Sequence, residues 1–176
     1  MVRQKSIEDV YHALSKKAQR LERTKPVLED IWEDSNIDFY LPCRWDFIPN
    51  GQQLLTIVAK QQRCFKIGIT NDPVHRFLTA PYAYLNRRIQ AKDNIWYTRM
   101  TIILCSESRE VVGMLEHSLI EWVRRTHRHI CANRAPGFDG PSFDDSDTDD
   151  DKPSSPGPHF CYVVDGPSVS AQQLQS

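Results

Sequence analysis

The strongest constraint on the fold is the apolar run NIWYTRMTIILC at residues 94–105, which leads into a helical pattern. Because β-branched and aromatic residues dominate the run, it favours a buried β-strand. Apolar residues then recur at helical spacing over residues 108–126 and predict a long amphipathic helix. A strand packed against this helix is therefore the minimum unit of the fold. The expected buried stripe of the helix comprises Val111, Val112, Leu115, Leu119, Trp122 and Val123.

Three further segments have the composition of strands. QLLTIVAK (53–60) and CFKIGIT (64–70) are β-rich and flank the turn QQR, so they predict a hairpin. HFCYVV (159–164) predicts a short closing strand. The expected order of elements is hairpin, helix, strand, helix and strand. This order predicts an α+β domain with a small antiparallel sheet and helices packed on it.

Composition divides the chain into four parts. SIEDVYHALSKKAQRLERT, with Ser6 as its N-cap, and PVLEDIWEDSN have helical patterns, and the loop-like FYLPCRWDFIPNG follows them. FDDSDTDDDKPSSPGP is acidic and rich in Ser and Pro, which is typical of disorder. We therefore expect a helical N-terminal extension at 1–48, an α+β domain at 49–138, an acidic disordered loop at 139–158, and a closing strand with a tail at 159–176.

Charge is segregated along the chain, although the net charge is only −1. Residues 51–138 carry 13 Lys or Arg against 6 Asp or Glu, whereas residues 139–151 carry 7 aspartates and no basic residue. A basic middle beside an acidic tract indicates a surface for a polyanion such as nucleic acid. Ordinary solvation is the alternative, and it is the favoured interpretation of the aspartate run, which lacks the spacing and glycine of a calcium loop.

The sequence predicts a soluble, intracellular protein, either cytoplasmic or nuclear, with no membrane partner. No stretch approaches the roughly 18 apolar residues that a membrane helix needs. The first ten residues, MVRQKSIEDV, lack the apolar core of a signal peptide. The 5 cysteines are scattered and form no CxxC pair, which favours reduced thiols over a disulfide framework.

The stretch CFKIGITNDPVHRF gathers the residues of a candidate anion site. Its strand ends at Gly68, where the missing side chain lets a ligand or another chain approach the backbone. Asn71 or Asp72 can cap a short helix whose first turns carry Arg76. A helix N-terminus favours an anion, Arg presents a planar fork to phosphate oxygens, and Lys66 projects beside it. The alternative is a hairpin with a solvated arginine.

Three segments carry a resemblance to a known family. FKIGITNDPVHRF is similar to the second half-motif of the GIY-YIG nuclease superfamily, closest to the phage-type branch with Lys in place of Tyr. KIG at residues 66–68 matches that motif, and Arg76 falls at the family's helix arginine. GMLEHSLIEWVRR resembles the family's glutamate helix through Glu116, and CANRAPGFDG resembles its terminal motif through Asn133. The resemblance covers residues 51–138, half of the chain.

The resemblance implies a GIY-YIG-like fold, with an antiparallel sheet of about three strands flanked by helices. It also implies a metal-dependent DNA endonuclease. Glu116 would hold one divalent ion, Mg²⁺ or Mn²⁺. Arg76 and Lys66 would contact the scissile phosphate as catalytic residues, Asn133 would be a DNA-binding positioning residue, and a tyrosine would handle the attacking water. A metal and an arginine both neutralise charge that grows on a phosphorane-like transition state.

One part of the family pattern is absent. The first half-motif supplies a tyrosine where this sequence has Leu55, and Lys66 replaces the second motif tyrosine. Tyr82, Tyr84 and Tyr97 are candidates to replace them. Because leucine cannot accept a proton, a catalytically inactive DNA-binding or protein-interaction module is the alternative function. A third is an interaction protein that binds a protein partner through the N-terminal helices or the acidic loop.

Two groups of arginines are further candidates for nucleic-acid binding. Arg87 and Arg88 are interleaved with aromatic residues in APYAYLNRRIQ, as in many single-strand-binding surfaces. A packed amphipathic segment is the alternative. Arg124, Arg125 and Arg128 end the glutamate helix, where they can cap the helix dipole or touch phosphate.

A zinc site is a different interpretation of two short segments. Their His and Cys residues alternate and could face one another if both segments are strands. The alternative is that the cysteines are buried and the histidines exposed. The residues concerned are His127, His129, Cys131, His159 and Cys161.

Overall fold

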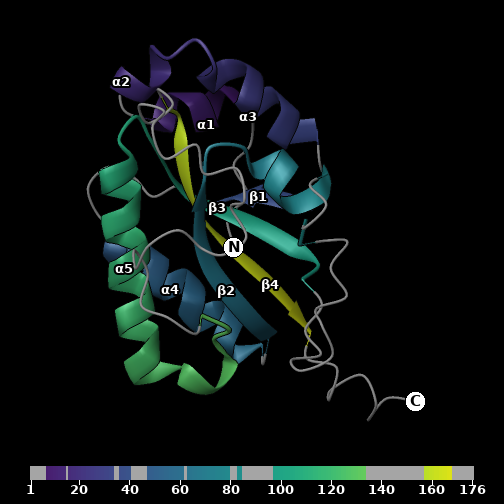
Figure 1. Cartoon of the computed structure of the whole chain (residues 1–176), viewed down its shortest axis with the longest axis vertical. Coiled ribbons are helices and arrows are strands. Elements are labelled where there is room, and N and C mark those ends of the chain that lie inside the picture. The colour runs from purple at the N-terminus through teal and green to yellow at the C-terminus, as the bar shows by residue number, and fades with distance from the viewer. Residues whose placement is uncertain are drawn as a thin grey trace, which may run out of the picture.

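A four-stranded mixed β-sheet forms the centre of the fold (Figure 1). The computed structural model describes residues 7–14, 16–33, 36–40, 47–61, 63–79, 83–84, 97–133 and 157–167. Within them the sheet order is β1-β3-β4-β2; β1 and β3 run parallel, and the other pairs are antiparallel. The α+β class is confirmed, but the purely antiparallel sheet of three strands is wrong, because a fourth strand adds a parallel edge. The strands are β1 (Ile37–Phe39), β2 (Arg63–Thr70), β3 (Arg99–Ser106) and β4 (His159–Pro167).

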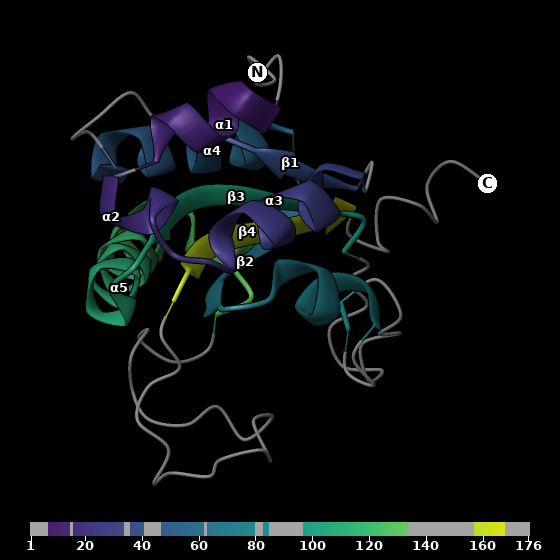
Figure 2. The same cartoon turned by 90° about the horizontal axis from the view of Figure 1, so that it is seen from above.

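Helices cover both faces of the sheet, as Figure 2 shows from above. One hydrophobic core joins α1, α2, α3 and η1 to the sheet face that carries Met100 and Tyr162. A second core joins α4 and α5 to the opposite face, which carries Phe65 and Val163. Strand side chains alternate between faces, so β3 and β4 contribute to both cores, whereas the apolar side chains of β2 belong to the second core. The helices are α1 (Ile7–Ala13), α2 (Lys16–Gln19), α3 (Thr24–Glu33), α4 (Phe47–Lys60), the π-helix η1 (His75–Thr79), α5 (Arg109–Thr126) and the 3₁₀-helix η2 (Arg128–Ile130).

The helices predicted near the N-terminus are present, with one break. The first predicted helix is divided into α1 and α2, because the side chain of Gln19 donates to the carbonyl oxygens of Tyr11 and Leu14 at 2.9 and 3.1 Å. These bonds satisfy carbonyls at the end of α1. The proposed cap Ser6 lies outside the described residues. β1, from the same N-terminal segment, pairs with β3 and shares its core.

The hairpin predicted over 53–70 is wrong, because residues 53–60 belong to helix α4. Leu54, Leu55 and Val58 are all buried, and their i, i+1, i+4 spacing is that of one helix face. Gly51 lies against Leu119 of α5, where an added Cβ would be 2.8 Å from its methyl carbons. The FIPNG segment, predicted to be a loop, is also helical, since a proline in the first turn removes no intrahelical bond.

The strand and helix predicted downstream of residue 94 are confirmed. β3 is buried along nearly its whole length, and α5 begins after Ser108, whose side chain accepts a hydrogen bond from the Val111 amide at 3.3 Å. The buried stripe of α5 is right for Val112, Leu115, Leu119 and Val123, but Val111 is exposed. β4 is also confirmed; it lies inside the sheet, between β3 and β2.

Two further predictions concern the acidic tract and membrane spans. The acidic tract at 139–151 lies outside the described residues. None of the helices within the described ranges is long and apolar enough to cross a membrane.

Candidate functional site

The turn after β2 positions Arg76. The hydroxyl of Thr70 accepts a bond from the Asp72 amide at 3.1 Å, and the Asp72 carboxylate accepts one from the His75 amide at 2.9 Å. Asp72 is therefore the N-cap, one of the two residues predicted for this role. The Arg76 amide donates to the Asp72 carbonyl at 3.0 Å. These bonds fix the backbone that carries the half-buried Arg76 side chain back toward the sheet.

Arg76 and Lys66 meet at two tyrosines. The Arg76 guanidinium lies 5.3 Å from the centre of the Tyr84 ring, and the Lys66 ammonium lies 5.7 Å from it. The hydroxyls of Tyr84 and Tyr162 are 3.2 Å apart, and Arg76 interacts with both. Tyr97 packs edge-on against Tyr84 with ring centres 5.3 Å apart. Two cations thus lie beside neutral hydroxyls and aromatic faces, which leaves their charge available to an anion.

The two tyrosines differ in their readiness to ionise. Burial alone would raise the pKa of Tyr84, but the charges of Lys66 and Arg76 and hydrogen bonds with Tyr162 and Arg76 lower it below its usual value. Burial and the nearby Tyr84 raise the pKa of Tyr162. Burial disfavours the charge on Arg76, yet the two tyrosines outweigh it and raise the Arg76 pKa. Either hydroxyl can donate in the hydrogen bond between them, and the nearby cations favour ionisation of Tyr84.

Gly68 makes room for Tyr162. The two residues are paired in the β2–β4 register, and a Cβ on Gly68 would be 2.5 Å from the Tyr162 hydroxyl oxygen and 2.7 Å from Cζ. The sequence predicted that Gly68 admits a ligand or another chain; the group that approaches is a side chain of the same protein. The missing side chain thus brings the Tyr162 hydroxyl to Arg76.

Sequence reasoning missed Tyr162, although it predicted the strand that carries it. The strand beside β2 was expected to be 53–60, so Leu55 was assigned the position of a tyrosine. In the structure Leu55 is buried in α4, and β4 occupies the antiparallel position beside β2. The alternating pattern of HFCYVV would have put Tyr162 on one face of a strand, but no local signal gives that strand its neighbour.

Glu116 lies on α5, where the charge of Lys66 acts on it. Burial raises the pKa of Glu116 to about 7, and the positive charges of Lys66 and His117 act in the opposite direction. Burial, and then the Glu116 charge, raise the pKa of Cys161 on β4. Lys66 therefore connects the predicted site residues: it lies with Arg76 at the Tyr84 ring, and it acts electrostatically on Glu116, a partly buried carboxylate whose pKa is raised to about 7.

Asn133 binds the exposed edge of β2. Its side chain accepts a bond from the Ile67 amide and donates to the Ile67 carbonyl, each at 2.8 Å. The Ala132 amide donates to the Phe65 carbonyl at 2.8 Å, so this segment closes the edge like a short strand. The Asn133 amide, predicted to contact nucleic acid, is thus used on the backbone next to Lys66.

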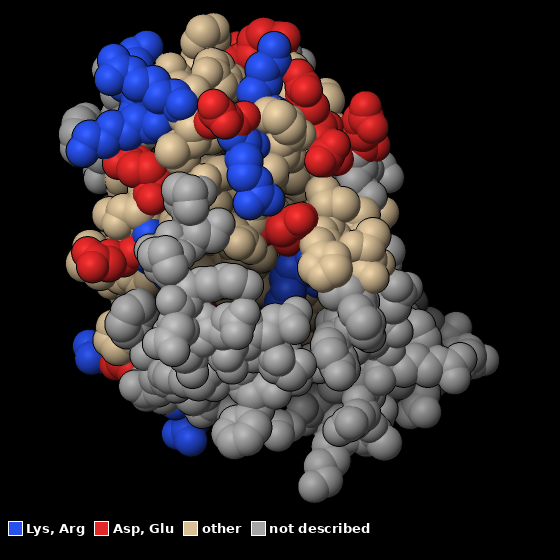
Figure 3. All heavy atoms as spheres, turned by 45° about the horizontal axis from the view of Figure 1, so that its top comes forward, with Lys and Arg blue, Asp and Glu red and all other residues tan. Residues whose placement is uncertain are grey.

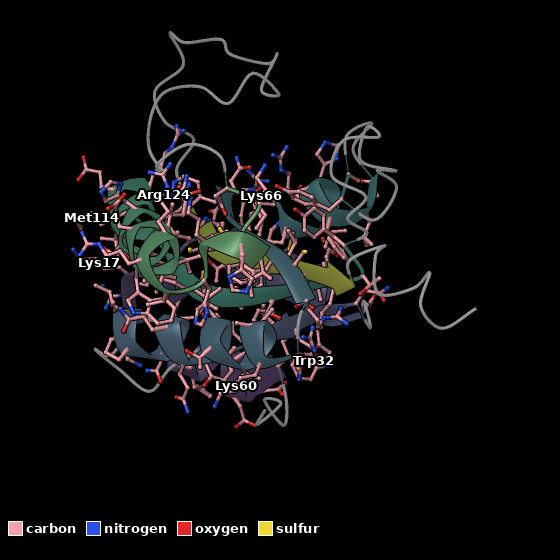
Figure 4. The ribbon with its side chains drawn as sticks, turned by 90° about the horizontal axis from the view of Figure 1, so that it is seen from below. Lys17, Trp32, Lys60, Lys66, Met114 and Arg124 are labelled. Atoms are coloured by element: carbon pink, nitrogen blue, oxygen red, sulfur yellow. The ribbon has the colours of Figure 1, made fainter. Side chains whose placement is uncertain are left out.

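A basic pocket adjoins this edge. It has a volume of about 530 Å³ and is lined by Arg124, Arg128, Cys131 and Asn133. Figure 4 shows Lys66 and Arg124 on the same side of the molecule. Arg124 is also 3.6 Å from Glu121, and Arg125 is 3.8 Å from the same carboxylate. The arginines at the end of α5 therefore divide into two that line the pocket and one, Arg125, that does not.

The only type of metal ligand that the candidate site was predicted to offer is the carboxylate of Glu116, which suits a hard divalent ion with few protein ligands. Among the described residues no three His, Cys, Asp or Glu side chains are grouped to hold a metal, so neither the proposed zinc site nor any all-protein cage is formed there. Mg²⁺ is usually bound by one or two carboxylates, with water and substrate phosphates as its other ligands. Glu116 is an oxygen donor of the kind that such an ion takes, and Lys66 is the cation that acts on it.

Some candidates cannot be located. Tyr82, Arg87 and Arg88 lie outside the described residues. The other surfaces are mixed in charge: in Figure 3 basic and acidic side chains are interspersed over the described part of the face that the N-terminal helices form. The candidate site is therefore identified by the contacts of Lys66 and Arg76 with the tyrosines. It is not identified by a uniformly basic surface.

Comparisons of the whole chain with protein-family models, curated proteins and solved structures found no match. The resemblance to GIY-YIG nucleases thus depends on the motifs and on the groups they bring together.

Proposed function

We propose that the protein is a metal-dependent endonuclease that hydrolyses phosphodiester bonds of DNA. One observation carries this proposal: Lys66 and Arg76 lie over the ring of Tyr84, a tyrosine of lowered pKa, and Lys66 also acts electrostatically on the carboxylate Glu116. Phosphoryl chemistry requires positive charge at the phosphate, a proton acceptor and a hard anionic ligand for a divalent ion. Each requirement is met by a different side chain of this group.

The roles follow from the chemistry of each side chain. Arg76 offers a planar fork to two phosphate oxygens, and Lys66 adds a point charge. Tyr162 contacts both Tyr84 and Arg76, so it is a positioning residue. Tyr84, as its phenolate, would accept the proton of the attacking water while one ester P–O bond breaks; the departing oxygen takes a proton from solvent, and the products are a phosphate monoester and a hydroxyl.

Glu116 would hold the divalent ion. Mg²⁺ or Mn²⁺ would neutralise negative charge on the phosphate oxygens during the reaction. Glu116 must be ionised to bind it, and its pKa of about 7 allows this near neutral pH. Because the same carboxylate is near Lys66, phosphate bound by Lys66 would lie within reach of the ion.

The proposal is tested by cleavage of supercoiled plasmid and branched DNA with Mg²⁺ or Mn²⁺. We expect nicking by the natural protein, and a loss of at least a hundredfold for Glu116→Gln, Arg76→Met and Tyr84→Phe, in line with the usual size of such catalytic contributions. Arg125→Ala is the matched control, because Arg125 is highly exposed and does not line the basic pocket. Cleavage that survives Glu116→Gln would exclude this site as its origin.

A second function, DNA binding without cleavage, is favoured by a specific observation. The hydroxyl-bearing side chains of Tyr84 and Tyr162 are almost fully buried, with 3% and 1% of their surface exposed, and an attacking water needs access to its base. This function predicts no nicking with any metal, but salt-dependent DNA binding that Lys66→Ala and Arg76→Met both weaken. Loss of binding in neither variant would exclude both functions at this site.

A further inference from the structure

A second polar cluster lies on the opposite face of the β2–β4 pair. Asp165 of β4 is fully buried and forms ion pairs with Arg63 of β2 and Arg99 of β3. Arg63 also donates to the Thr98 hydroxyl at 2.8 Å. Because Asp165 pairs with Phe65 in the register, it faces away from Lys66 and Gly68, which pair with Val164 and Tyr162. The two clusters are therefore separate sites on one strand pair.

The two arginines of the Asp165 cluster carry more positive charge than the Asp165 carboxylate neutralises. Among the residues that the structure describes, one carboxylate pairs with two guanidinium groups, which leaves one excess positive charge. Arg99 bonds to Asp165 through Nε and Nη2, at 3.1 to 3.3 Å, and Arg63 uses Nε and Nη2 for Asp165 and Thr98. Nη1 of each arginine lies outside these interactions. Since a guanidinium has five N–H donors in a fixed fork, both arginines retain donors on a rigid support.

These arginines line a pocket whose lining residues are all polar or charged. The pocket has a volume of about 280 Å³, and its lining residues are Asn36, Gln61, Arg63, Thr98 and Arg99. That volume is several times the roughly 30 Å³ that one water occupies in the liquid, so a tetrahedral anion with some hydration fits. The arginine side chains are 26% and 28% exposed, so both are open to solvent. Figure 4 shows Lys60, the residue before Gln61, on the opposite side from Lys66.

We propose that this pocket, defined by Arg63, Arg99, Thr98, Gln61 and Asn36, is a binding site for a phosphate group. Asp165 holds the two arginines in a fixed arrangement, so little side-chain entropy is lost when the anion binds. Arg63 and Arg99 supply charge-assisted hydrogen bonds, and the amide and hydroxyl groups of the wall supply neutral ones. The ligand is inorganic phosphate or the phosphate group of a nucleotide, because the two arginines favour an anion with several oxygen acceptors. The proposal does not depend on nuclease activity.

The test uses a variant that spares the ion pairs. Replacing Arg63, Arg99 or Asp165 would leave a buried charge unpaired and could unfold the chain. Gln61 is exposed at the pocket, and Gln61→Glu adds a negative charge there. Gln53→Glu is the matched control, because Gln53 is also exposed on α4 and does not line the pocket. Lys66→Ala/Arg76→Met, alone and combined with Gln61→Glu, removes phosphate bound at the other cluster.

Binding of inorganic phosphate to the full chain is measured by titration calorimetry and by thermal shift, against chloride at equal ionic strength. We expect binding that persists in Gln53→Glu and in Lys66→Ala/Arg76→Met, and that Gln61→Glu weakens about tenfold through charge repulsion. Thymidine 5′-monophosphate that binds more tightly than inorganic phosphate, with thymidine not binding, would identify a nucleotide as the source. Equal affinities would identify free phosphate. No effect beyond chloride, or equal binding by the two glutamate variants, would overturn the proposal.

Discussion

The β2–β4 strand pair carries a basic cluster on each face, and the two clusters differ in what opposes their charge. On one face Arg63 and Arg99 are held by the fully buried Asp165. On the other, Arg76 and Lys66 lie against the rings and hydroxyls of Tyr84 and Tyr162. The first cluster therefore has half of its positive charge compensated by one buried carboxylate, and the cations of the second lie against tyrosine rings and hydroxyls.

The difference separates stability from function. A buried carboxylate with two arginine partners costs several kcal/mol when its partnership is broken, because a charge is then left without compensation. Cations beside tyrosines can be removed without leaving a buried charge unpaired. Their loss should therefore lower the affinity for a ligand more than the stability of the fold. We expect the Asp165 cluster to dominate stability and the Arg76 cluster to dominate nucleic-acid binding.

The largest predicted effect is on stability and concerns Asp165. Asp165→Asn should lower the free energy of unfolding by about 3–5 kcal/mol, because Arg63 and Arg99 lose their shared counter-charge. Urea denaturation followed by circular dichroism measures the change. Asp30→Asn, at an exposed position of α3, is the matched control and should change stability by no more than about 0.5 kcal/mol. Similar losses in both variants would show that the ion pairs do not support the sheet.

The second effect concerns the close approach on the other face. Gly68→Ala should cost about 1–3 kcal/mol, because its Cβ would overlap the buried Tyr162 ring, which is rigid and cannot withdraw. Gly51→Ala is the comparison: the overlapped atoms are the mobile methyl carbons of Leu119, and alanine favours the helix. Thermal denaturation of the two variants should rank Gly68→Ala clearly below Gly51→Ala. The reverse order would mean that Tyr162 can move away from Gly68.

Local sequence predicted the parts of this fold that local forces determine. A cap at Asn71 or Asp72, the β3 strand, the α5 helix and the existence of β4 all follow from patterns within a few residues. The segment 53–60 was misassigned because a short apolar run suits either a strand or one helix face. Leu119 and the other residues of α5 decide between them by packing on α4.

The sequence allowed the charged residues of the candidate site to be predicted. It did not allow prediction of the side chains that contact them. Lys66, Arg76 and Glu116 follow from motifs, but Tyr162 reaches Arg76 only through pairing of β2 with a strand far along the chain. The Asp165 cluster depends on the same pairing, since Arg63 and Asp165 are 102 residues apart. Register across such separations is set by the whole core, which no local pattern encodes.

A third prediction sharpens the separation of stability from binding. Arg76→Met keeps an apolar stem against Tyr84 and should lower stability by about 1 kcal/mol or less, the value of a cation–π contact. The same change should weaken DNA binding and reduce the slope of log affinity against log salt by about 1, because one phosphate contact is lost. Fluorescence anisotropy at several salt concentrations measures the slope. A stability loss as large as that of Asp165→Asn would erase the distinction between the clusters.

The smallest predicted effect is the pH dependence of stability at Glu116. The pKa of Glu116 is about 7 in the folded chain, and the ordinary value of 4.5 applies to the unfolded chain. The folded state therefore binds the proton more tightly than the unfolded state does. The stability that this proton contributes is fully present below pH 4.5 and is lost as pH rises through about 7. Nearby Lys66 limits the effect by favouring the carboxylate. Glu116→Gln cannot titrate, so from pH 5 to pH 8 without metal it should lose less stability than the natural protein. Glu110→Gln, exposed on α5, controls for charge removal; equal pH profiles for all three proteins would show that Glu116 has no raised pKa.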